Sequence, residues 1–109
     1  MIGPDPGQRV GAILSANNGV VKLLGFGVYV GDEVPPNEGE RSMTGMLAEE
    51  ELPNPKIVLD NGDIVWGCEC WWGPADEMER ELASWRAKEW KIETVRISDE
   101  RLPEPVGNA

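Results

Sequence analysis

The stretch that decides the fold is 56–74, KIVLDNGDIVWGCECWWGP. Its Asp-Asn-Gly at 60–62 tolerates positive φ and is flanked by alternating apolar residues, so it predicts a β-hairpin with a two-residue turn. The alternation past the turn predicts one strand over 64–72. One strand face then holds Ile64, Trp66, Cys68, Cys70 and Trp72, and the other holds Val65, Gly67, Glu69 and Trp71. A small domain cannot bury indole rings on both faces, so we expect one face to contact a ligand or a partner.

Three strands are predicted before this hairpin. Residues 9–15 (RVGAILS) and 20–24 (VVKLL) are apolar and β-prone. The Asn-Gly pair within 16–19 suits the positive-φ positions of a primed turn and predicts that these two strands form a hairpin. A third, glycine-rich strand is predicted at 25–31 (GFGVYVG).

A helix and a last strand are predicted after the hairpin. Pro74 suits the first position of a helix, and acidic residues follow it in the first turn. Met78, Leu82 and Trp85 recur at helical spacing, so we predict an amphipathic helix that runs to about Trp90. Alternation over 91–97 (KIETVRI) then predicts a strand.

These elements predict an α+β fold that is mainly β. We expect a small curled antiparallel sheet, or an SH3-like or roll-like barrel, with one helix in the C-terminal half. Residues 1–109 are expected to form a single domain. Within it, 1–8 is predicted to be a loose arm and 98–109 a frayed tail. The long acidic connection 35–55, with a short helix at 42–52, is either partly disordered or a binding lid.

Composition narrows the function classes. The chain carries a net charge of −10, which disfavours direct nucleic-acid binding because cations supply most of that affinity. The charge serves either solubility or the contact with a basic partner, including mimicry of a nucleic-acid backbone. Histidine is absent, which removes the usual general base and the usual zinc nitrogen ligand. No apolar run suits a membrane span or a signal peptide, so a cytoplasmic protein is expected.

The predicted binding site combines the glycine-rich strand with the tryptophan-rich one. Glycines leave one face of 25–31 nearly bare around Tyr29, which permits either tight backbone packing and curvature or the approach of a ligand ring. Trp71 can stack on such a ring. A phosphate could be neutralised by Arg9, Lys22, Lys56 or Arg96. The predicted ligand-binding residues are Gly25, Gly27, Tyr29, Gly31, Glu69, Trp71 and Arg96.

No catalytic residue, metal ligand or cofactor is predicted. Cys68 and Cys70 are only half of a tetrahedral metal site, so we interpret them as reduced, buried small hydrophobic residues. An enzyme would have to rely on carboxylates. Glu69, if held among apolar side chains with a raised pKa, is the candidate for that role.

Two segments carry a resemblance. GFGVYVGDEVPP at 25–36 and NPKIVLDNGDIVWGCECWWGP at 54–74 resemble small uncharacterised acidic proteins of phages and prophages. The resemblance implies an inhibitor of host defence. Some such inhibitors are small β-rich proteins that sequester nucleotide-derived signals, and others are acidic proteins that block a nucleic-acid-binding surface.

The sequence thus leads to three hypotheses. The first is a non-enzymatic binding protein, phage-encoded and homodimeric, that sequesters a small nucleotide-like ligand to block host defence. The alternative is an acidic protein–protein inhibitor or nucleic-acid mimic that covers a basic host protein. The third is a carboxylate-dependent, metal-assisted hydrolase.

Overall fold

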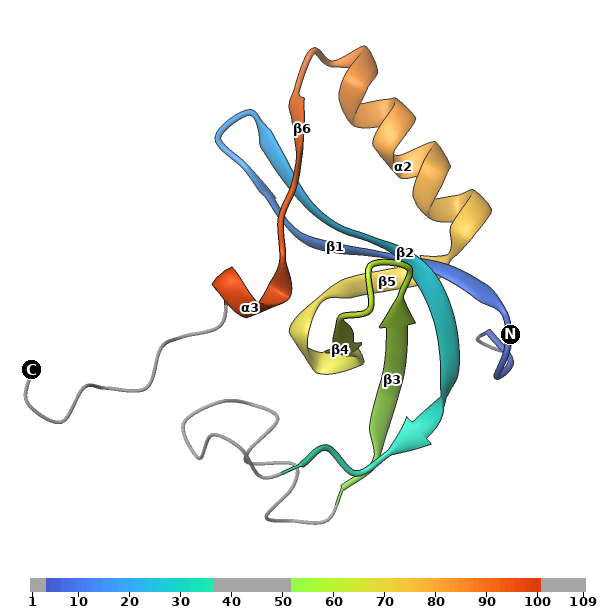
Figure 1. Ribbon diagram of the computed structural model, residues 1–109. Coiled ribbons are helices and arrows are strands. Elements are labelled where there is room, and N and C mark those ends of the chain that lie inside the picture. Colours follow the sequence, from blue (N-terminus) through green and yellow to red (C-terminus); the bar gives the residue numbers. More distant parts are fainter. Residues whose placement is uncertain (1–3, 37–51, 101–109) are drawn as a thin grey trace, which may run out of the picture.

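The computed structural model describes residues 4–36 and 52–100, which form a curled sheet with one main helix (Figure 1). In chain order the elements are β1 (Arg9–Asn17), β2 (Val20–Glu33), β3 (Asn54–Leu59), β4 (Ile64–Trp66), the 3₁₀ turn η1 (Gly67–Glu69), β5 (Trp71–Pro74), α2 (Ala75–Ala87), β6 (Lys91–Thr94) and α3 (Ile97–Glu100). The predicted fold class is confirmed: the structure is mainly antiparallel sheet, with its main helix in the C-terminal half.

The sheet is open and does not close into a barrel. Its strands follow the order β4-β3-β2-β1-β5, and β6 lies beside the first half of β2 as a parallel neighbour. Strands β4 and β5 therefore lie at the two ends of this order. The long strand β2 connects the parts of the sheet, because its first half pairs with β1 and β6 and its second half pairs with β1 and β3.

Both predicted hairpins form. Between β1 and β2, Asn18 has φ 52° and Gly19 has φ 80°, which are the positive values of a two-residue primed turn. The predicted two-residue turn between β3 and β4 is wrong in its length. Of its residues only Gly62 has a positive φ, and the Gly62 N–H donates to the Leu59 carbonyl at 2.9 Å. The loop thus has three residues, with glycine at the left-handed position.

Two strands predicted separately, 20–24 and 25–31, are one strand. Gly25 and Gly31 have φ values of 130° and 119°, and each lies beside a shift in the pairing register of β2. A β-bulge at such a position bends the strand and increases its twist. Because glycine adopts these positive φ values without strain, β2 can continue through two bends. Residues with a side chain rarely adopt them, so a strand of such residues would end there.

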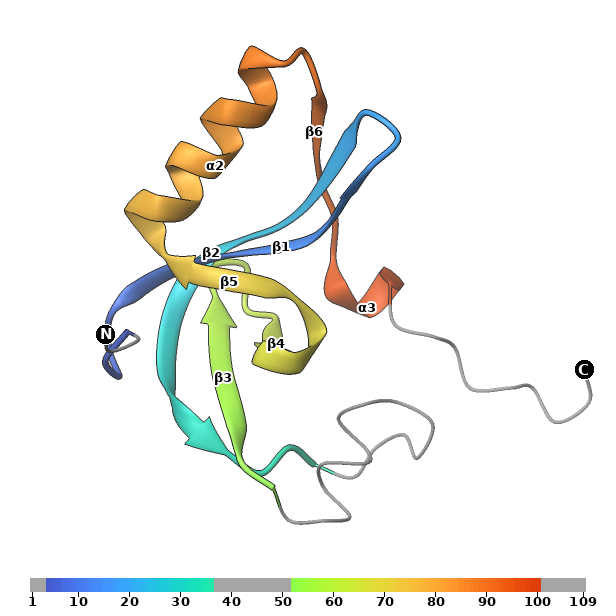
Figure 2. The ribbon, with the colours of Figure 1, turned by 180° about the vertical axis from the view of Figure 1, so that it is seen from behind.

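The two faces of the sheet carry separate hydrophobic clusters. The inner cluster lies within the curl of the sheet and consists of Val10, Ala12, Leu24, Tyr29, Ile57, Leu59, Val65 and Ile97. The helix cluster lies under α2 and consists of Ile13, Val21, Met78 and Leu82, with Trp85 and Trp90 packed against it. Successive residues of β1 alternate between the two clusters, as the period of a strand requires. Helix α2 thus packs against the side of β1 that includes Ile13. Figure 2 shows the helix on one side of the β1–β2 hairpin, seen from behind.

The helix matches its prediction on the buried face but differs at its ends. Pro74 precedes the first helical residue, and Met78 and Leu82 are buried. The helix ends at Ala87 and not near Trp90. There Glu89 adopts a positive φ of 66°, and the Trp90 N–H donates to the Trp85 carbonyl at 3.0 Å. This closing turn lets the chain reverse into β6.

The two terminal segments are described in part. Residues 1–8 are predicted as a loose arm; within the described residues 4–8, the Gly7 N–H donates to the Tyr29 carbonyl at 2.7 Å and the Tyr29 N–H donates to the Gln8 carbonyl at 3.1 Å. The predicted strand 91–97 ends at Thr94, and the predicted frayed tail begins inside a helical turn, α3, whose Ile97 is buried. Residues 1–3 and 101–109 lie outside the described residues.

The acidic connection predicted for 35–55 is shorter at both described ends. Pro35 is fully buried, and β3 already begins at Asn54. The predicted helix at 42–52 lies outside the described residues except for Leu52, which is exposed and belongs to no helix. Among the described residues, no helix is long and apolar enough to cross a membrane.

Candidate binding surface

Tyr29 is a core residue, although the sequence suggested an exposed stacking ring. Only 9 % of it is exposed, and its ring centroid lies 5.2 Å from that of Trp72 within the inner cluster. Its hydroxyl donates a 2.5 Å hydrogen bond to the Asp32 carboxylate. This bond, with burial and the nearby negative charge as smaller causes, raises the pKa of Tyr29 above its ordinary value. The ring therefore supports the fold, and the hydroxyl is already engaged.

The glycines around Tyr29 serve the backbone. A Cβ on Gly27 would lie 2.2 Å from the Val58 carbonyl oxygen and 2.5 Å from the Leu59 Cα, so β3 occupies the space that a ligand would need. Gly25 and Gly31 have the positive φ values that bend β2. Of the two interpretations of the glycine-rich strand, the described residues favour backbone packing and curvature.

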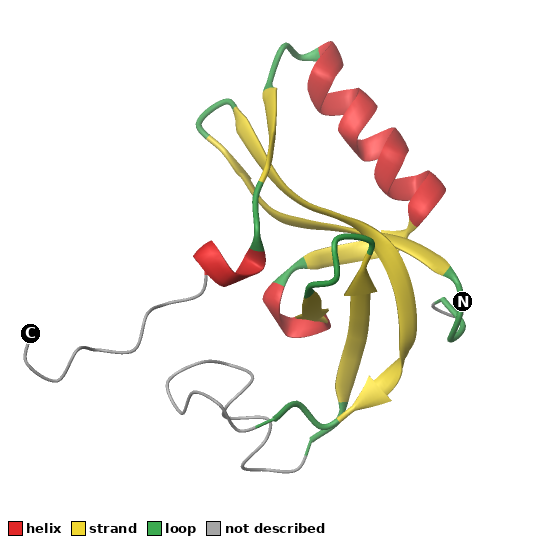
Figure 3. Cartoon of the chain, in the orientation of Figure 1, coloured by secondary structure: helices red, strands yellow, loops and turns green. Residues whose placement is uncertain are grey.

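The tryptophan-rich stretch 64–72 is not one strand, so the predicted division of its residues between two faces is wrong beyond Trp66. The turn η1 interrupts it, visible in Figure 3 as the short helical segment between β4 and β5. A Cβ on Gly67 would approach Pro55, Trp72 and the Asn54 side chain to about 3 Å, so a regular strand with side chains has no room here. The Trp66 N–H donates to Glu69 Oε1 at 3.1 Å, which gives Glu69 a structural hydrogen bond inside the turn.

The two cysteines have different surroundings, and the prediction that both are buried is wrong for Cys68. Cys68 is exposed, whereas Cys70 is largely buried and its Sγ donates to the Trp66 carbonyl at 3.5 Å. Burial, followed by the charges of Glu69 and Cys68, raises the pKa of Cys70 to about 12. A thiol with this pKa stays protonated at neutral pH and is a poor nucleophile. No group of three or more Cys, Asp or Glu that could hold a metal ion occurs in the described part of the chain.

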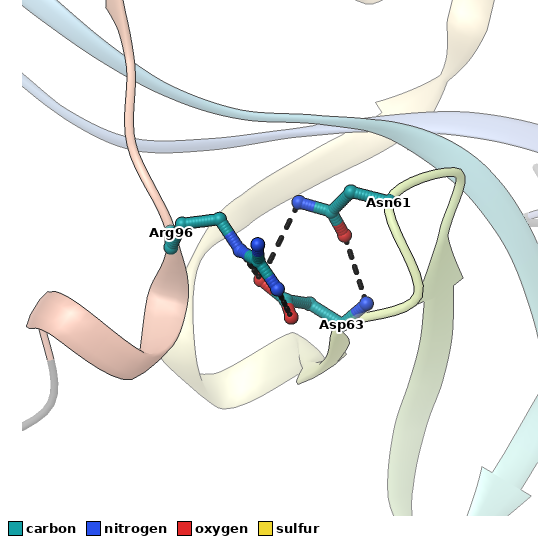
Figure 4. A network of polar contacts seen from close by, with 3 residues as sticks. All are labelled: Asn61, Asp63 and Arg96. Atoms are coloured by element: carbon teal, nitrogen blue, oxygen red, sulfur yellow. Dashed lines mark hydrogen bonds and ion pairs between the residues drawn. The ribbon is translucent and has the colours of Figure 1, made fainter.

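Each cation proposed to bind a phosphate is paired with a carboxylate of this chain. Arg96 donates to both oxygens of Asp63, at 2.8 Å and 2.6 Å, and Asn61 also contacts that carboxylate (Figure 4). Arg9 forms the same two-point contact with Asp60, at 2.7 Å and 2.8 Å. These bonds raise the pKa of both arginines and lower that of Asp60. The remaining two pairs are Lys22–Glu100 and Lys56–Glu33, each at 3.2 Å.

Trp71 is the predicted site residue that the structure leaves accessible. It is 48 % exposed and is the only aromatic residue among the large exposed apolar residues in the described part of the chain. Trp71 is the cross-strand partner of Ile13, so its ring projects from the sheet face that α2 covers.

The solvent side of α2 is acidic. Residues Asp76, Glu77 and Glu79 are exposed and Glu81 is half-buried. Arg80 lies 3.8 Å from Asp76. No ion pair between described residues involves Glu77, Glu79 or Glu81. At 3.6 residues per turn, Glu77 and Glu81 lie on one flank of α2 and Glu79 lies on the other. We call the exposed part of α2 that carries these three carboxylates the acidic helix surface.

The structure therefore divides the predicted site. Tyr29, Gly27 and Glu69 are structural, Arg96 is paired with Asp63, and Trp71 is accessible. The predicted site does not contain the acidic residues of α2. Their signal was present in the run DEMERE at 76–81, which places acidic residues around a helix whose apolar stripe is Met78 and Leu82.

Comparisons with protein-family models, with curated proteins and with solved structures found no match for this chain.

Proposed function

We propose that this protein is a non-enzymatic binding protein whose acidic helix surface covers a basic patch on another protein. The observation that carries the proposal is a helix on which Glu77, Glu79 and Glu81 form no ion pair with a described residue, in a chain whose Trp71 ring is also exposed. Tryptophan is enriched among the residues that dominate protein interfaces. Unpaired carboxylates and an exposed indole ring both favour a lysine- or arginine-rich partner, because these cations can bind a carboxylate or an indole face.

The distribution of charge supports a basic partner over an anionic ligand. Arg9, Lys22, Lys56 and Arg96 are already paired with carboxylates, so an anionic ligand would have to compete with those carboxylates for them. A nucleotide-like ligand needs a cation for its phosphate and an aromatic ring for its base. Arg96 and Tyr29 would have to leave Asp63 and the inner cluster to provide them. Sequestration of such a ligand stays a prediction from the resemblance, as does a role against host defence.

Binding of a labelled lysine 20-mer, followed by fluorescence anisotropy at 0.15 M NaCl, tests the proposal. The variant Glu77→Gln/Glu79→Gln/Glu81→Gln should bind at least tenfold more weakly than the wild type. A control with the same change in net charge, Asp5→Asn/Glu89→Gln/Asp99→Asn, should stay within twofold, because its exposed carboxylates lie elsewhere. Trp71→Ala should weaken binding severalfold with no change in charge.

Equal losses in the two triple variants would show that bulk charge alone attracts the peptide, and the proposal would then fail. A separate thermal-shift screen with cyclic nucleotides and ADP-ribose addresses the other function. Binding to the native state raises its stability, by about 2.7 kcal/mol at a hundredfold excess over Kd. Such a rise with one of these nucleotides, together with no preference among the peptide variants, would favour sequestration.

A further inference from the structure

We infer that Asn18 is a site of spontaneous deamidation, and that its modification loosens the attachment of β6 to the sheet. The chain contains two Asn-Gly pairs, Asn18-Gly19 and Asn61-Gly62, and each lies at the tip of a hairpin. In such a pair the main-chain nitrogen of the glycine can attack the asparagine side chain, because glycine has no side chain to block the approach. The two pairs differ in their hydrogen bonds, and this difference selects Asn18.

Asn61 is held by its neighbours. Its Oδ1 accepts a hydrogen bond from the Asp63 N–H at 2.8 Å, and its Nδ2 donates to Asp63 Oδ2 at 3.4 Å (Figure 4). The attacking nitrogen is engaged as well, because the Gly62 N–H donates to the Leu59 carbonyl at 2.9 Å. Reaction at Asn61 must therefore break hydrogen bonds of both the side chain and the main chain.

Asn18 lacks these restraints. It is exposed, and its side chain makes no hydrogen bond with another residue in 4–36 or 52–100. Within the same ranges, no main-chain hydrogen bond uses the Gly19 N–H. A Cβ placed on Gly19 would have nothing within 4 Å, so the turn is open to solvent and to the motion that the attack requires. The carboxamide and the nitrogen that attacks it are thus both available.

The reaction needs only water as a co-reactant. The Gly19 N–H loses its proton to solvent base, and its nitrogen forms a bond to Asn18 Cγ. The bond from Cγ to the side-chain nitrogen then breaks, and this nitrogen takes up a proton from water and leaves as ammonia. Water opens the resulting five-membered succinimide. Attack at Cγ gives aspartate, and attack at the main-chain carbonyl carbon gives isoaspartate, in which the main chain runs through Cγ. Isoaspartate thus lengthens the main chain by one carbon atom and adds one negative charge.

The longer main chain does not fit the turn between β1 and β2. Asn17 and Val20 are cross-strand partners, so only two residues connect the strands, with φ values of 52° and 80°. The same turn holds the start of β6, because the Gly19 carbonyl accepts a hydrogen bond from the Lys91 N–H at 2.9 Å. Isoaspartate at position 18 displaces this carbonyl, so β6 loses the hydrogen bond at its first residue.

Incubation of the folded protein at pH 8.5 and 37 °C, followed by peptide mapping by mass spectrometry, tests the site. Asn18 should deamidate at least about fivefold faster than Asn61, because Asn61 must first break its hydrogen bonds. In 6 M guanidinium chloride the two rates should agree within about twofold, since both asparagines precede glycine and the fold no longer protects either. Asn18→Gly is the matched control. Glycine suits the positive φ and has no carboxamide, so this variant should stay unmodified at the turn.

Amide hydrogen exchange tests the effect on β6. The Lys91 N–H should exchange at least about threefold faster in the isolated isoaspartate form than in the fresh protein, because it has lost its acceptor. Freshly prepared Asn18→Asp carries the same added charge on a main chain of normal length, so its Lys91 N–H should exchange at the wild-type rate. The inference fails if the folded protein deamidates at Asn61 as fast as at Asn18, or at neither residue. It also fails if the difference persists in guanidinium chloride, or if the isoaspartate form protects Lys91 as well as the fresh protein does.

Discussion

The replacement of Tyr29 by alanine tests whether this residue belongs to the core or to a binding platform. Its ring is 9 % exposed and packs 5.2 Å from the Trp72 ring. Truncation of a buried aromatic residue to alanine costs about 3–5 kcal/mol, of which an aromatic pair accounts for about 0.5–1.5 kcal/mol. With a urea m value of about 1.5 kcal/mol/M, the unfolding midpoint should fall by about 2–3 M.

Two companion variants separate the contributions to this loss. Tyr29→Phe keeps the ring and removes the hydroxyl that donates to Asp32, so it should cost about 1 kcal/mol. Trp71→Ala removes a ring that is 48 % exposed, so it should cost less than about 1 kcal/mol. Urea unfolding followed by far-UV circular dichroism measures all three. If Tyr29→Ala costs no more than Trp71→Ala, the assignment of Tyr29 to the core is refuted.

The other predictions concern Gly27 and the cysteines. Gly27→Ala should destabilise the fold by about 1–3 kcal/mol or more, because the new Cβ would meet the backbone of β3. Gly73→Ala should be nearly neutral, because its Cβ would lie 3.6 Å from Met78 Sδ. Equal urea unfolding midpoints for the two variants would contradict this prediction. At pH 8, iodoacetamide should alkylate Cys68 rapidly and Cys70 only after unfolding, as peptide mapping by mass spectrometry can determine. The pKa of Cys70 is raised from 9.0 in the unfolded chain to about 12 in the folded protein. Its contribution to the free energy of unfolding should therefore be complete below pH 9, where the thiol is neutral in both states, and should be lost as the pH rises from 9 to about 12. The free energies of unfolding of the wild type and of Cys70→Ala, measured by urea titration at each pH, should converge over this range. A constant difference between them would show that Cys70 does not titrate as proposed.

Local sequence determined the elements whose signals are local. The Asn18-Gly19 pair and Gly62 supply left-handed backbone at the tips of the two hairpins, and both hairpins form. Pro74 and the spacing of Met78 and Leu82 predict the start and the buried face of α2, because capping and a helical period depend on neighbours within a few residues. The predicted curled, mainly antiparallel sheet follows from these elements and is confirmed.

Tertiary structure decided what depends on residues far apart in the chain. Residues 64–72 alternate like one strand, yet the crowding of Gly67 by Asn54, Pro55 and Trp72 accompanies the turn η1. Tyr29 is buried because the curled sheet brings Trp72, on the end strand β5, against its ring, which no pattern within 25–31 encodes.

The ion pairs likewise depend on tertiary structure, whereas the net charge depends on composition alone. Arg9 and Asp60 are 51 residues apart in sequence, and Arg96 and Asp63 are 33 apart, so only the folded sheet brings each pair together. Composition alone gave the net charge of −10, but it could not tell which carboxylates are neutralised inside the fold. The pairing of distant residues engages cations of the sheet, whereas Glu77, Glu79 and Glu81 on α2 form no ion pair with a described residue.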